Sequence, residues 1–412
     1  MIYSYLIIYF VLIRNLIPDL STLFLYLPMI HRVGKNKLKQ LASKFRVVAV
    51  VGPRQSGKTT ICKTTFPRKP YVSLENPDIA EFATADPKGF LKQFKNGAIL
   101  DEVQKLPHLF SYIQQIVDEN NKAGFFILSG SNNFLMQESI SQTLAGRVAY
   151  LHLLPCSLKE LKTAKLLSDY QSHIFSGAYP EPLYKNIDTV DWYSNYINTY
   201  VERDVRQLKN ITDLALFMKF LRLCAGRTGQ ILNMQSLGND CGIDAKTVQA
   251  WLYILQSSYI IYLLRPFYNN YNKRIIKAPK LYFYDTGVAC SLLGLQNVEQ
   301  HAFHPSIGAL FENMMIIDLL KQRLNNGLQD NLYYWRDKTG NELDVLLDTA
   351  TAVTAVEIKA GATMNSDYQK GLLYFKDLAD DKKKLKTIIC YTGSVIQNRS
   401  NGIEVRPWGK II

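Results

Sequence analysis

The stretch from residue 52 to residue 60 combines glycines, a lysine and hydroxyls in a fixed order. Gly52 is followed by four residues and then by Gly57, Lys58 and Thr59, which fits the pattern GxxxxGK[ST]. Glycines let backbone N–H groups wrap around a phosphate, and the positive end of the following helix faces the same anion. We expect Lys58 to reach the β- and γ-phosphates of ATP and the Thr59 hydroxyl to bind Mg²⁺. The residues expected to hold the nucleotide are Gly52, Pro53, Arg54, Gln55, Ser56, Gly57, Lys58, Thr59 and Thr60.

Two acidic residues end a second apolar run. Residues 98–100 are Ala, Ile and Leu, and Asp101 and Glu102 follow them. At the end of a neighbouring strand, Asp101 is expected beside the Mg²⁺ and also in contact with the nucleotide site. Glu102 is expected to polarise a water molecule. Paired acids at this place favour hydrolysis over transfer of phosphate to a small molecule, so the sequence predicts an ATPase.

Two further side chains are candidates for sensing the γ-phosphate. Ser129 follows the apolar run 125–128, although a turn rich in Ser, Gly and Asn would explain the same letters. Arg147 precedes another apolar run and is a candidate arginine finger or sensor, since a planar cation stabilises charge that develops on the phosphate. A surface arginine at the start of a strand is the alternative interpretation.

The elements that must position these residues alternate along the first part of the chain. Short apolar runs lie near residues 47, 71, 98, 125 and 148, with helical stretches between them. This alternation predicts a parallel sheet between two layers of helices, which is the αβα sandwich of P-loop proteins. Ligands of such sheets bind at the carboxyl ends of the strands.

The middle of the chain predicts helices followed by a winged helix. Residues 157–232 have a helical pattern, and residues 232–284 predict two helices, the second capped by Asp244, followed by two strands. Basic residues gather in the expected wing, and the clustering favours contact with a nucleic-acid backbone. Docking to a protein is the alternative. The basic residues of the wing are Arg265, Lys273, Arg274, Lys277 and Lys280.

A second group of acids lies in the last third. A hairpin is expected to bring Asp344 together with Glu357 and Lys359, and Glu312 is expected from a helix that begins near Ile307. Carboxylates hold Mg²⁺ through oxygen, and a lysine beside them can orient water or stabilise a phosphate under attack. Surface charges that alternate along a strand would produce the same letters.

Charge and cysteine usage limit the partners and the compartment. The 412 residues carry 48 Lys and Arg against 35 Asp and Glu, a net charge of +13, which favours a polyanionic partner, here DNA or another nucleic acid. The six cysteines form no CxxC pair, which predicts free thiols in a reducing cytoplasm and no disulfide-linked partner.

The first 28 residues are apolar, but Arg14 and Asp19 interrupt them. No uncharged stretch therefore reaches the roughly 20 residues of a membrane span. They also lack the basic start and the small-residue cleavage site of a secretory signal. Met29 opens a basic amphipathic helix, so we expect an over-extended start at residues 1–28 and no membrane association; a membrane-associated helix is the alternative.

The acids of the last third, arranged D-x(12)-E-x-K after a helical glutamate, resemble the PD-(D/E)xK restriction-nuclease superfamily. From Met29 onward the chain is similar to prokaryotic AAA-type ATPases that carry a C-terminal domain of unknown function 4143. The blocks that carry this resemblance, in order, are GPRQSGKTT, ILDEVQ, LSGSN, LAGR, GAYPE, YVERDV, YDTGV, FEN and GNELDVLL…VEIKAG. The resemblance implies an ATPase domain, a winged helix and a nuclease-like domain, and it implies no particular substrate.

The sequence thus predicts an α/β protein in four segments: an extension at 1–28, a P-loop ATPase domain at 29–156, a helical and winged-helix part at 157–300, and a nuclease-like α/β domain at 301–412. The expected function is a cytoplasmic, Mg²⁺-dependent ATPase whose nucleotide state controls a nucleic-acid-binding and DNA-cleaving module. In this hypothesis Glu357 and Lys359 act in cleavage. The alternative is an ATP-switched scaffold whose C-terminal acids do not cleave. The sequence does not set the oligomeric state.

Overall fold

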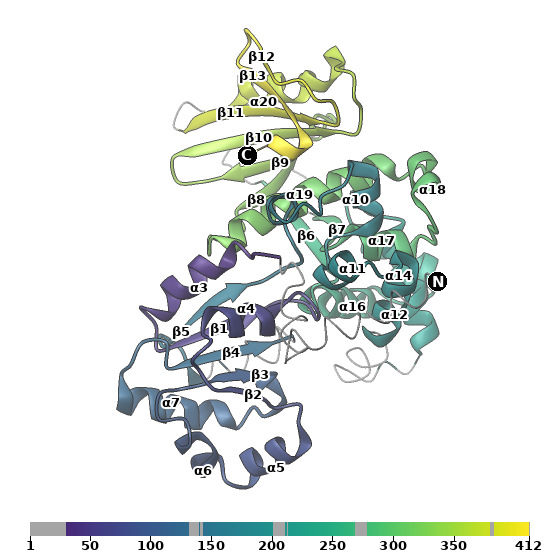
Figure 1. Cartoon of the computed structure of the whole chain (residues 1–412). Helices are drawn as coiled ribbons and strands as arrows, with labels where there is room; N and C mark the ends of the chain where they lie inside the picture. Colours follow the sequence, from purple (N-terminus) through teal and green to yellow (C-terminus); the bar gives the residue numbers. More distant parts are fainter. Residues whose placement is uncertain are drawn as a thin grey trace, which may run out of the picture.

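The computed structural model describes residues 30–131, 140, 143–200, 211, 213–267, 278–379 and 383–411. The expected extension at residues 1–28 lies outside them. Figure 1 shows a parallel sheet at one end of the molecule, a group of helices in the middle, and a second sheet at the other end. Among the described residues, no helix is both long and apolar enough to cross a membrane.

The first sheet has five parallel strands in the order β2-β3-β4-β1-β5, as the alternation of apolar runs and helices predicts. Its middle strands are buried because β-branched and other apolar residues fill both faces. The strands are β1 (Val47–Val51), β2 (Tyr71–Ser73), β3 (Ile99–Asp101), β4 (Phe126–Gly130) and β5 (Val148–His152).

Helices cover both faces of this sheet, and β1 shows why. Val48 and Val50 pack with residues of α3 and α4, whereas Val47, Ala49 and Val51 pack with residues of α5, α6 and α7. Successive strand residues point to opposite faces, so a strand covered on both sides must be apolar throughout. The helices are α3 (Gly34–Ala42), α4 (Lys58–Thr65), α5 (Pro77–Ala85), α6 (Pro87–Lys92) and α7 (Leu109–Asn120), with a 3₁₀ turn η2 (Val103–Lys105).

The middle of the chain is helical, as predicted. Asp244 caps α16, since its side chain accepts hydrogen bonds from the backbone N–H groups of Lys246 and Thr247. The helix pair α15–α16 therefore begins and turns where the sequence indicates. The helices are α9 (Leu158–Thr163), α10 (Tyr170–Ser176), α11 (Pro180–Lys185), α12 (Thr189–Tyr200), α14 (Leu214–Ala225), α15 (Met234–Cys241), α16 (Ala245–Ser257), α17 (Thr286–Leu292) and α18 (Val298–Phe303).

The second sheet is mixed and has eight strands in the order β12-β13-β11-β10-β9-β8-β6-β7. Its strands are β6 (Ile261–Pro266), β7 (Lys280–Phe283), β8 (Leu332–Arg336), β9 (Glu342–Asp348), β10 (Ala352–Lys359), β11 (Lys384–Tyr391), β12 (Gln397–Asn398) and β13 (Ile403–Pro407). The remaining elements are α19 (Ile307–Asn325), η4 (Ser366–Gln369), α20 (Lys370–Leu378) and η5 (Trp408–Lys410). Helices α19 and α20 belong to two different hydrophobic clusters, and each cluster contains its own group of side chains from this sheet.

The two strands expected in the wing are part of this sheet. β6 pairs with β7 in antiparallel fashion, and β6 also pairs with β8 in parallel through Arg265–Tyr333 and Pro266–Tyr334. The strands of the middle part and those of the C-terminal part thus share one sheet. The sequence pattern of the hairpin did not indicate this pairing. The tip of the hairpin, with Lys273, Arg274 and Lys277, lies outside the described residues.

Candidate nucleotide site and acid–lysine cluster

The loop between β1 and α4 has the backbone geometry of an anion-binding turn. Gln55 and Gly57 have left-handed conformations, with φ of 59° and 93°. Left-handed residues that alternate with other conformations direct successive backbone N–H groups into a concavity that binds anions. Gly52 is required for packing, because a Cβ atom there would lie 2.1 Å from the Leu153 carbonyl oxygen. The loop therefore depends on its glycines in the way that the motif predicts.

Lys58 lies inside this loop and is 5% exposed. Its Nζ donates a hydrogen bond to the Pro53 carbonyl oxygen at 2.7 Å. Burial lowers the pKa of Lys58 to about 8, and the carboxylates of Glu102 and Asp101 oppose this effect. The lysine thus lies between the loop and the two acids, where a phosphate would replace the carbonyl as its partner.

Asp101 is the centre of a set of short polar contacts at the end of β3. Its Oδ2 accepts hydrogen bonds from the Thr59 hydroxyl at 2.7 Å and from the Tyr71 hydroxyl at 2.8 Å. Its Oδ1 accepts one from Ser129 Oγ at 2.5 Å, since β3 and β4 place these two residues side by side. A hydroxyl and a carboxylate oxygen in contact fit the ligands that Mg²⁺ prefers. Tyr71 was not foreseen, because no nucleotide motif contains it.

Glu102 follows Asp101 and has an unusual backbone conformation, with φ of 54°. Its carboxylate accepts hydrogen bonds from the Gln104 side chain and from Ser131 Oγ, the latter at 3.1 Å. Positive φ in a residue other than glycine is uncommon and is held by such surrounding contacts. The arrangement directs the carboxylate into the same cavity as Lys58.

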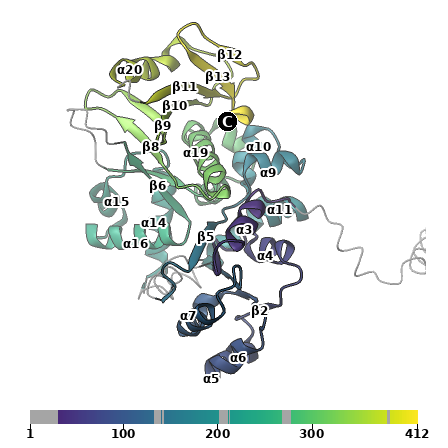
Figure 2. The ribbon, with the colours of Figure 1, turned by 90° about the vertical axis from the view of Figure 1, so that its left-hand side faces the viewer.

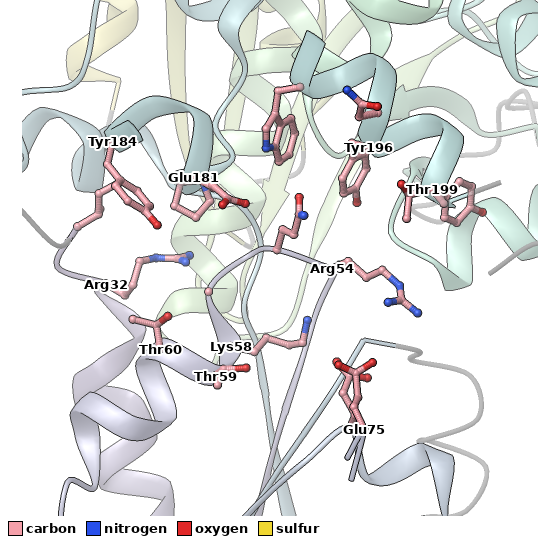
Figure 3. A pocket seen from close by; sticks show the side chains of 18 of the residues that line it. Arg32, Arg54, Lys58, Thr59, Thr60, Glu75, Glu181, Tyr184, Tyr196 and Thr199 are labelled. Carbon is pink, nitrogen blue, oxygen red and sulfur yellow. The ribbon is translucent and has the colours of Figure 1, made fainter. Parts of the chain in front are cut away.

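The cavity above the loop has a volume of about 880 Å³ and two walls from different parts of the chain. One wall is the loop with Thr59 and Thr60, and the other belongs to α11 and α12. Figure 3 shows Tyr184 and Tyr196 of these helices on the side of the cavity opposite Lys58. The sequence did not indicate that the helical part completes this cavity.

Arg147 lies at the wrong edge of the sheet for the role that the sequence suggested. It precedes β5, and its carbonyl oxygen accepts from the N–H of Val47 at the start of β1. Parallel strands start at one edge and carry the loop at the other, so the five residues of β1 separate Arg147 from the loop by roughly 16 Å. Its guanidinium donates to both carboxylate oxygens of Asp118, at 2.6 and 2.8 Å. The prediction of a sensor for the nucleotide of the same chain is wrong.

In the second sheet, Asp344 and Glu357 are near neighbours on adjacent strands. The register of β9 and β10 pairs Val345 with Val356, which places Asp344 opposite Glu357. Lys359 Nζ lies 2.6 Å from Glu357 Oε1 and 3.7 Å from Asp344 Oδ2. The predicted trio is therefore brought together, with the lysine between the two carboxylates.

Glu312 joins this group from α19 but has other partners. Its Oε1 accepts from the Tyr282 hydroxyl at 2.5 Å and lies 3.1 Å from Lys280 Nζ. Lys280 also forms an ion pair with Glu342 and is 3% exposed. Lys280 is thus a buried partner of two acids, and its assignment to an exposed basic wing is corrected. We refer to Lys280, Tyr282, Glu312, Glu342, Asp344, Glu357 and Lys359 as the acid–lysine cluster.

Two carboxylates of the cluster hold protons more tightly than usual. Burial, followed by the charge of Asp344, raises the pKa of Glu357 to about 8 and that of Glu312 to about 7. Glu357 Oε2 is buried and has no hydrogen-bond partner among the residues that the structure describes. In the part of the chain that the structure describes, no three His, Cys, Asp or Glu side chains are grouped to hold a metal ion. Lys280 and Tyr282 both contact Oε1 of Glu312, and the role of Glu312 as a third metal ligand stays a prediction.

Three family models match successive parts of the chain. An AAA domain matches residues 44–162, a domain of unknown function (DUF8612) matches residues 167–299, and a domain of unknown function (DUF4143) matches residues 307–411. Among curated relatives, an uncharacterized protein of Mycobacterium tuberculosis is 28% identical over 337 residues, which are 81% of this chain and 74% of that protein. An uncharacterized protein of Haemophilus influenzae is 23% identical over 304 residues, which are 68% of each chain.

Solved structures with similar folds include a Walker-type ATPase of Pyrococcus abyssi, with a TM-score of 0.45 and 16% identity. That match covers 64% of this chain and 96% of the other. The RuvB Holliday junction branch migration motor of Thermotoga maritima has a TM-score of 0.31 and 15% identity, over 57% of this chain and 90% of the other.

Proposed function

Since this chain is an AAA-type P-loop ATPase that carries a C-terminal domain of unknown function 4143, we propose that its nucleotide state controls a nucleic-acid-binding module. The module consists of the helical part and the second sheet. In this proposal ATP and Mg²⁺ bind at the loop between β1 and α4. Hydrolysis there changes how the helical part is held, and DNA is the polyanion that the module binds.

The observation that carries the proposal is the cavity with walls from two parts of the chain. Phosphates held by Lys58 and Thr59 would leave the rest of the nucleotide between the loop and the helices α11 and α12. Loss of the γ-phosphate removes charge from this space, so the contacts of the two walls would differ between ATP and ADP. A ligand that contacts two states differently shifts the balance between them.

The proposed roles at the loop follow from the contacts. Lys58 neutralises the β- and γ-phosphates, and Thr59 with Asp101 would hold Mg²⁺, which neutralises the charge of the phosphates when it is bound. Glu102 would orient the attacking water, since its carboxylate faces the cavity and is held by two donors. Ser129 keeps Asp101 in place and is assigned a supporting role.

One helix connects the ATPase part with the acid–lysine cluster. Just past its middle, Asp318 of α19 accepts from the Leu158 N–H at 2.7 Å, in the segment that follows the first sheet. Less than two turns earlier, Asn313 exchanges two hydrogen bonds with the backbone of Phe283 in β7, at 2.7 and 2.8 Å. Figure 2 shows α19 between the two sheets. A movement of the ATPase part would therefore displace the helix that carries Glu312.

Nucleic acid is proposed as the partner because the chain carries a net positive charge. The net charge is +13, and Lys280 no longer contributes to an exposed basic surface. Arg265 remains exposed and lies 5.5 Å from the ring centroid of Tyr333. An exposed arginine beside an aromatic ring suits a phosphate next to a stacked base.

DNA cleavage by the acid–lysine cluster is a second candidate function. It is favoured by the pair Asp344 and Glu357, which share Lys359, and by the unpartnered Oε2 atom of Glu357. Burial and the neighbouring charge of Asp344 raise the pKa of Glu357, and a divalent cation held by the two carboxylates would offset that repulsion. The cation would activate water, and Lys359 would stabilise the phosphate under attack. A scaffold in which these acids only stabilise the fold is the competing interpretation.

One experiment tests these functions together: purified chain with labelled DNA, with and without ATP and Mg²⁺. Glu102→Gln should keep ATP bound and lower its turnover by about 10²-fold or more, because only the water-orienting group is lost. Lys58→Ala should lose ATP binding and turnover.

Turnover of Glu102→Gln at the wild-type rate would reject the role of Glu102. DNA affinity that is the same with ATP, with ADP and without nucleotide would reject the control of DNA binding by the nucleotide. Cleavage products that disappear in Lys359→Ala would establish the second function, and their absence in the wild type would favour the scaffold.

A further inference from the structure

We infer that Arg32 is a positioning residue for the phosphate-binding loop, although it lies outside the nucleotide motif. The inference rests on the proposed binding of ATP at this loop. Arg32 is 7% exposed, and its guanidinium contacts three partners from different segments. Nη1 donates to the Ser56 carbonyl oxygen at 2.6 Å, Nη2 donates to that of Leu154 at 2.6 Å, and Nε donates to Glu160 Oε1 at 3.1 Å.

The contact with Ser56 sets the direction of a peptide unit in the loop. In a planar trans peptide, the carbonyl of one residue and the N–H of the next point in opposite directions. Arg32 holds the Ser56 carbonyl toward itself, so the Gly57 N–H points the other way, toward the place expected for the phosphates. Gly57 has a φ of 93°. A glycine can adopt other backbone conformations at similar energy, so the residue alone does not fix this one. A charged donor on the cavity wall beside the loop (Figure 3) therefore selects one orientation of this peptide, the one that leaves its N–H for an anion.

Glu160 fixes the guanidinium in turn. Its carboxylate is buried, and besides Arg32 it accepts hydrogen bonds from the N–H groups of Val33 at 2.7 Å and Ser157 at 2.8 Å. Burial alone would lower the pKa of Arg32, but Glu160 reverses the direction, and the side chain stays charged. A planar fork with several partners has little freedom to rotate. The loop is thus held at one wall of the cavity by a rigid pair of charges.

Two other roles would place the same atoms here, and they predict different results. If Arg32 only stabilised the fold, its removal would lower the melting temperature and leave nucleotide affinity of the folded protein unchanged. If it contacted a phosphate directly as a charge, lysine would replace it in large part. Positioning requires the planar guanidinium with its several N–H donors. A single lysine Nζ cannot donate to the carbonyls of Ser56 and Leu154 and to the Glu160 carboxylate at the same time.

The test is a titration of the full chain with fluorescent ADP and ATP in the presence of Mg²⁺, at a temperature where circular dichroism shows each variant folded. Arg32→Met should bind ADP and ATP about tenfold more weakly, by similar factors, since the Gly57 N–H serves a group common to both. Turnover at saturating ATP should change less than affinity. Arg32→Met lowers the logarithm of nucleotide affinity by a certain amount relative to the wild type. Arg32→Lys should recover less than half of that amount. Lys39→Met, on the exposed side of α3, is the matched control and should bind like the wild type.

The outcomes separate this inference from the proposed function. A wild-type chain that binds neither nucleotide contradicts the proposed function. A wild type that binds, with Arg32→Met within twofold of it, contradicts the inference alone, and so does full recovery by Arg32→Lys. Should Arg32→Met fail to fold, Glu160→Gln decides. This substitution keeps the size of the side chain and one oxygen acceptor, and it should lower the affinity for both ADP and ATP about threefold. Unchanged affinity would overturn the positioning role.

Discussion

At the residue scale, His152 connects the ATPase part with the helical part. It ends β5, and its Nδ1 lies 3.0 Å from the Tyr259 hydroxyl, while the ring stacks on Tyr150. Burial lowers the pKa of His152 to about 4 from its usual 6.5. The ring is therefore uncharged in the folded chain at neutral pH, which suits a position among tyrosines.

The titration of His152 predicts a stability change at mildly acid pH. The unfolded chain binds a proton near pH 6.5 and the folded chain only near pH 4, so the contribution is fully present above 6.5 and is lost as the pH falls toward 4. The full loss is on the order of 3 kcal/mol. His152→Asn cannot titrate, so its free energy of unfolding in urea should fall less over this range than that of the wild type. His31→Asn, an exposed control, should keep the wild-type slope; equal slopes for His152→Asn would contradict the prediction.

How far single residues could be predicted depends on how local their partners are. The motif identified Lys58 and Thr59, and the strand end identified Asp101, because each signal lies within a few neighbouring positions. Arg32 and Glu160 are separated by 128 positions and share no local pattern, so only the folded chain shows their contact. The error at Arg147 had a different origin. Its place before a strand already put it at the edge of a parallel sheet that faces away from the loop.

At the element scale, the hairpin β6–β7 shows what a strand pattern leaves open. Alternating and apolar residues predict two strands that pair with each other, which the structure confirms. They do not predict that β6 also pairs with β8, since Arg265 and Tyr333 are far apart in the chain. This pairing brings Lys280 to Glu312 and Glu342. A lysine that looks like part of a basic surface becomes part of a buried cluster.

The position of β7 predicts the effect of removing its lysine. Lys280→Met leaves Glu312 and Glu342 without their shared cation in a buried site, which should lower the free energy of unfolding by about 3–5 kcal/mol. Urea denaturation measures this loss. Lys370→Met is the matched control, because Lys370 pairs with Asp367 on the surface, where removal should cost less than about 1 kcal/mol.

The opposite pattern would restore the wing interpretation for Lys280. In that case Lys280→Met would unfold at the wild-type urea concentration and bind DNA more weakly, with a smaller dependence on salt. The three basic residues of the hairpin tip lie outside the described residues, so their part in DNA binding stays a prediction. Salt dependence of binding in a variant that lacks Lys273, Arg274 and Lys277 measures it.

At the scale of the whole molecule, the three parts are joined more closely than three matched families suggest. The helical part supplies one wall of the nucleotide cavity and two strands of the C-terminal sheet. Helix α19, which begins the C-terminal part, reaches back to the segment after the first sheet through Asp318 and Lys321. Each part is thus in contact with the other two, and the order of elements along the chain could not reveal this, because the contacts join distant segments.

This arrangement predicts that nucleotide binding protects both walls of the cavity. With ADP and Mg²⁺ in large excess over the dissociation constant, binding stabilises the folded state by about 3 kcal/mol at a hundredfold excess. Amide hydrogen exchange followed by mass spectrometry should then slow in the loop and α4, and also in α11 and α12, whose Tyr184 and Tyr196 face the cavity (Figure 3). Lys58→Ala, exposed to the same nucleotide, should show no protection in either place. Protection confined to residues 47–65 would mean that the helices do not contact the nucleotide, and the proposed control of the C-terminal module would lose its physical connection.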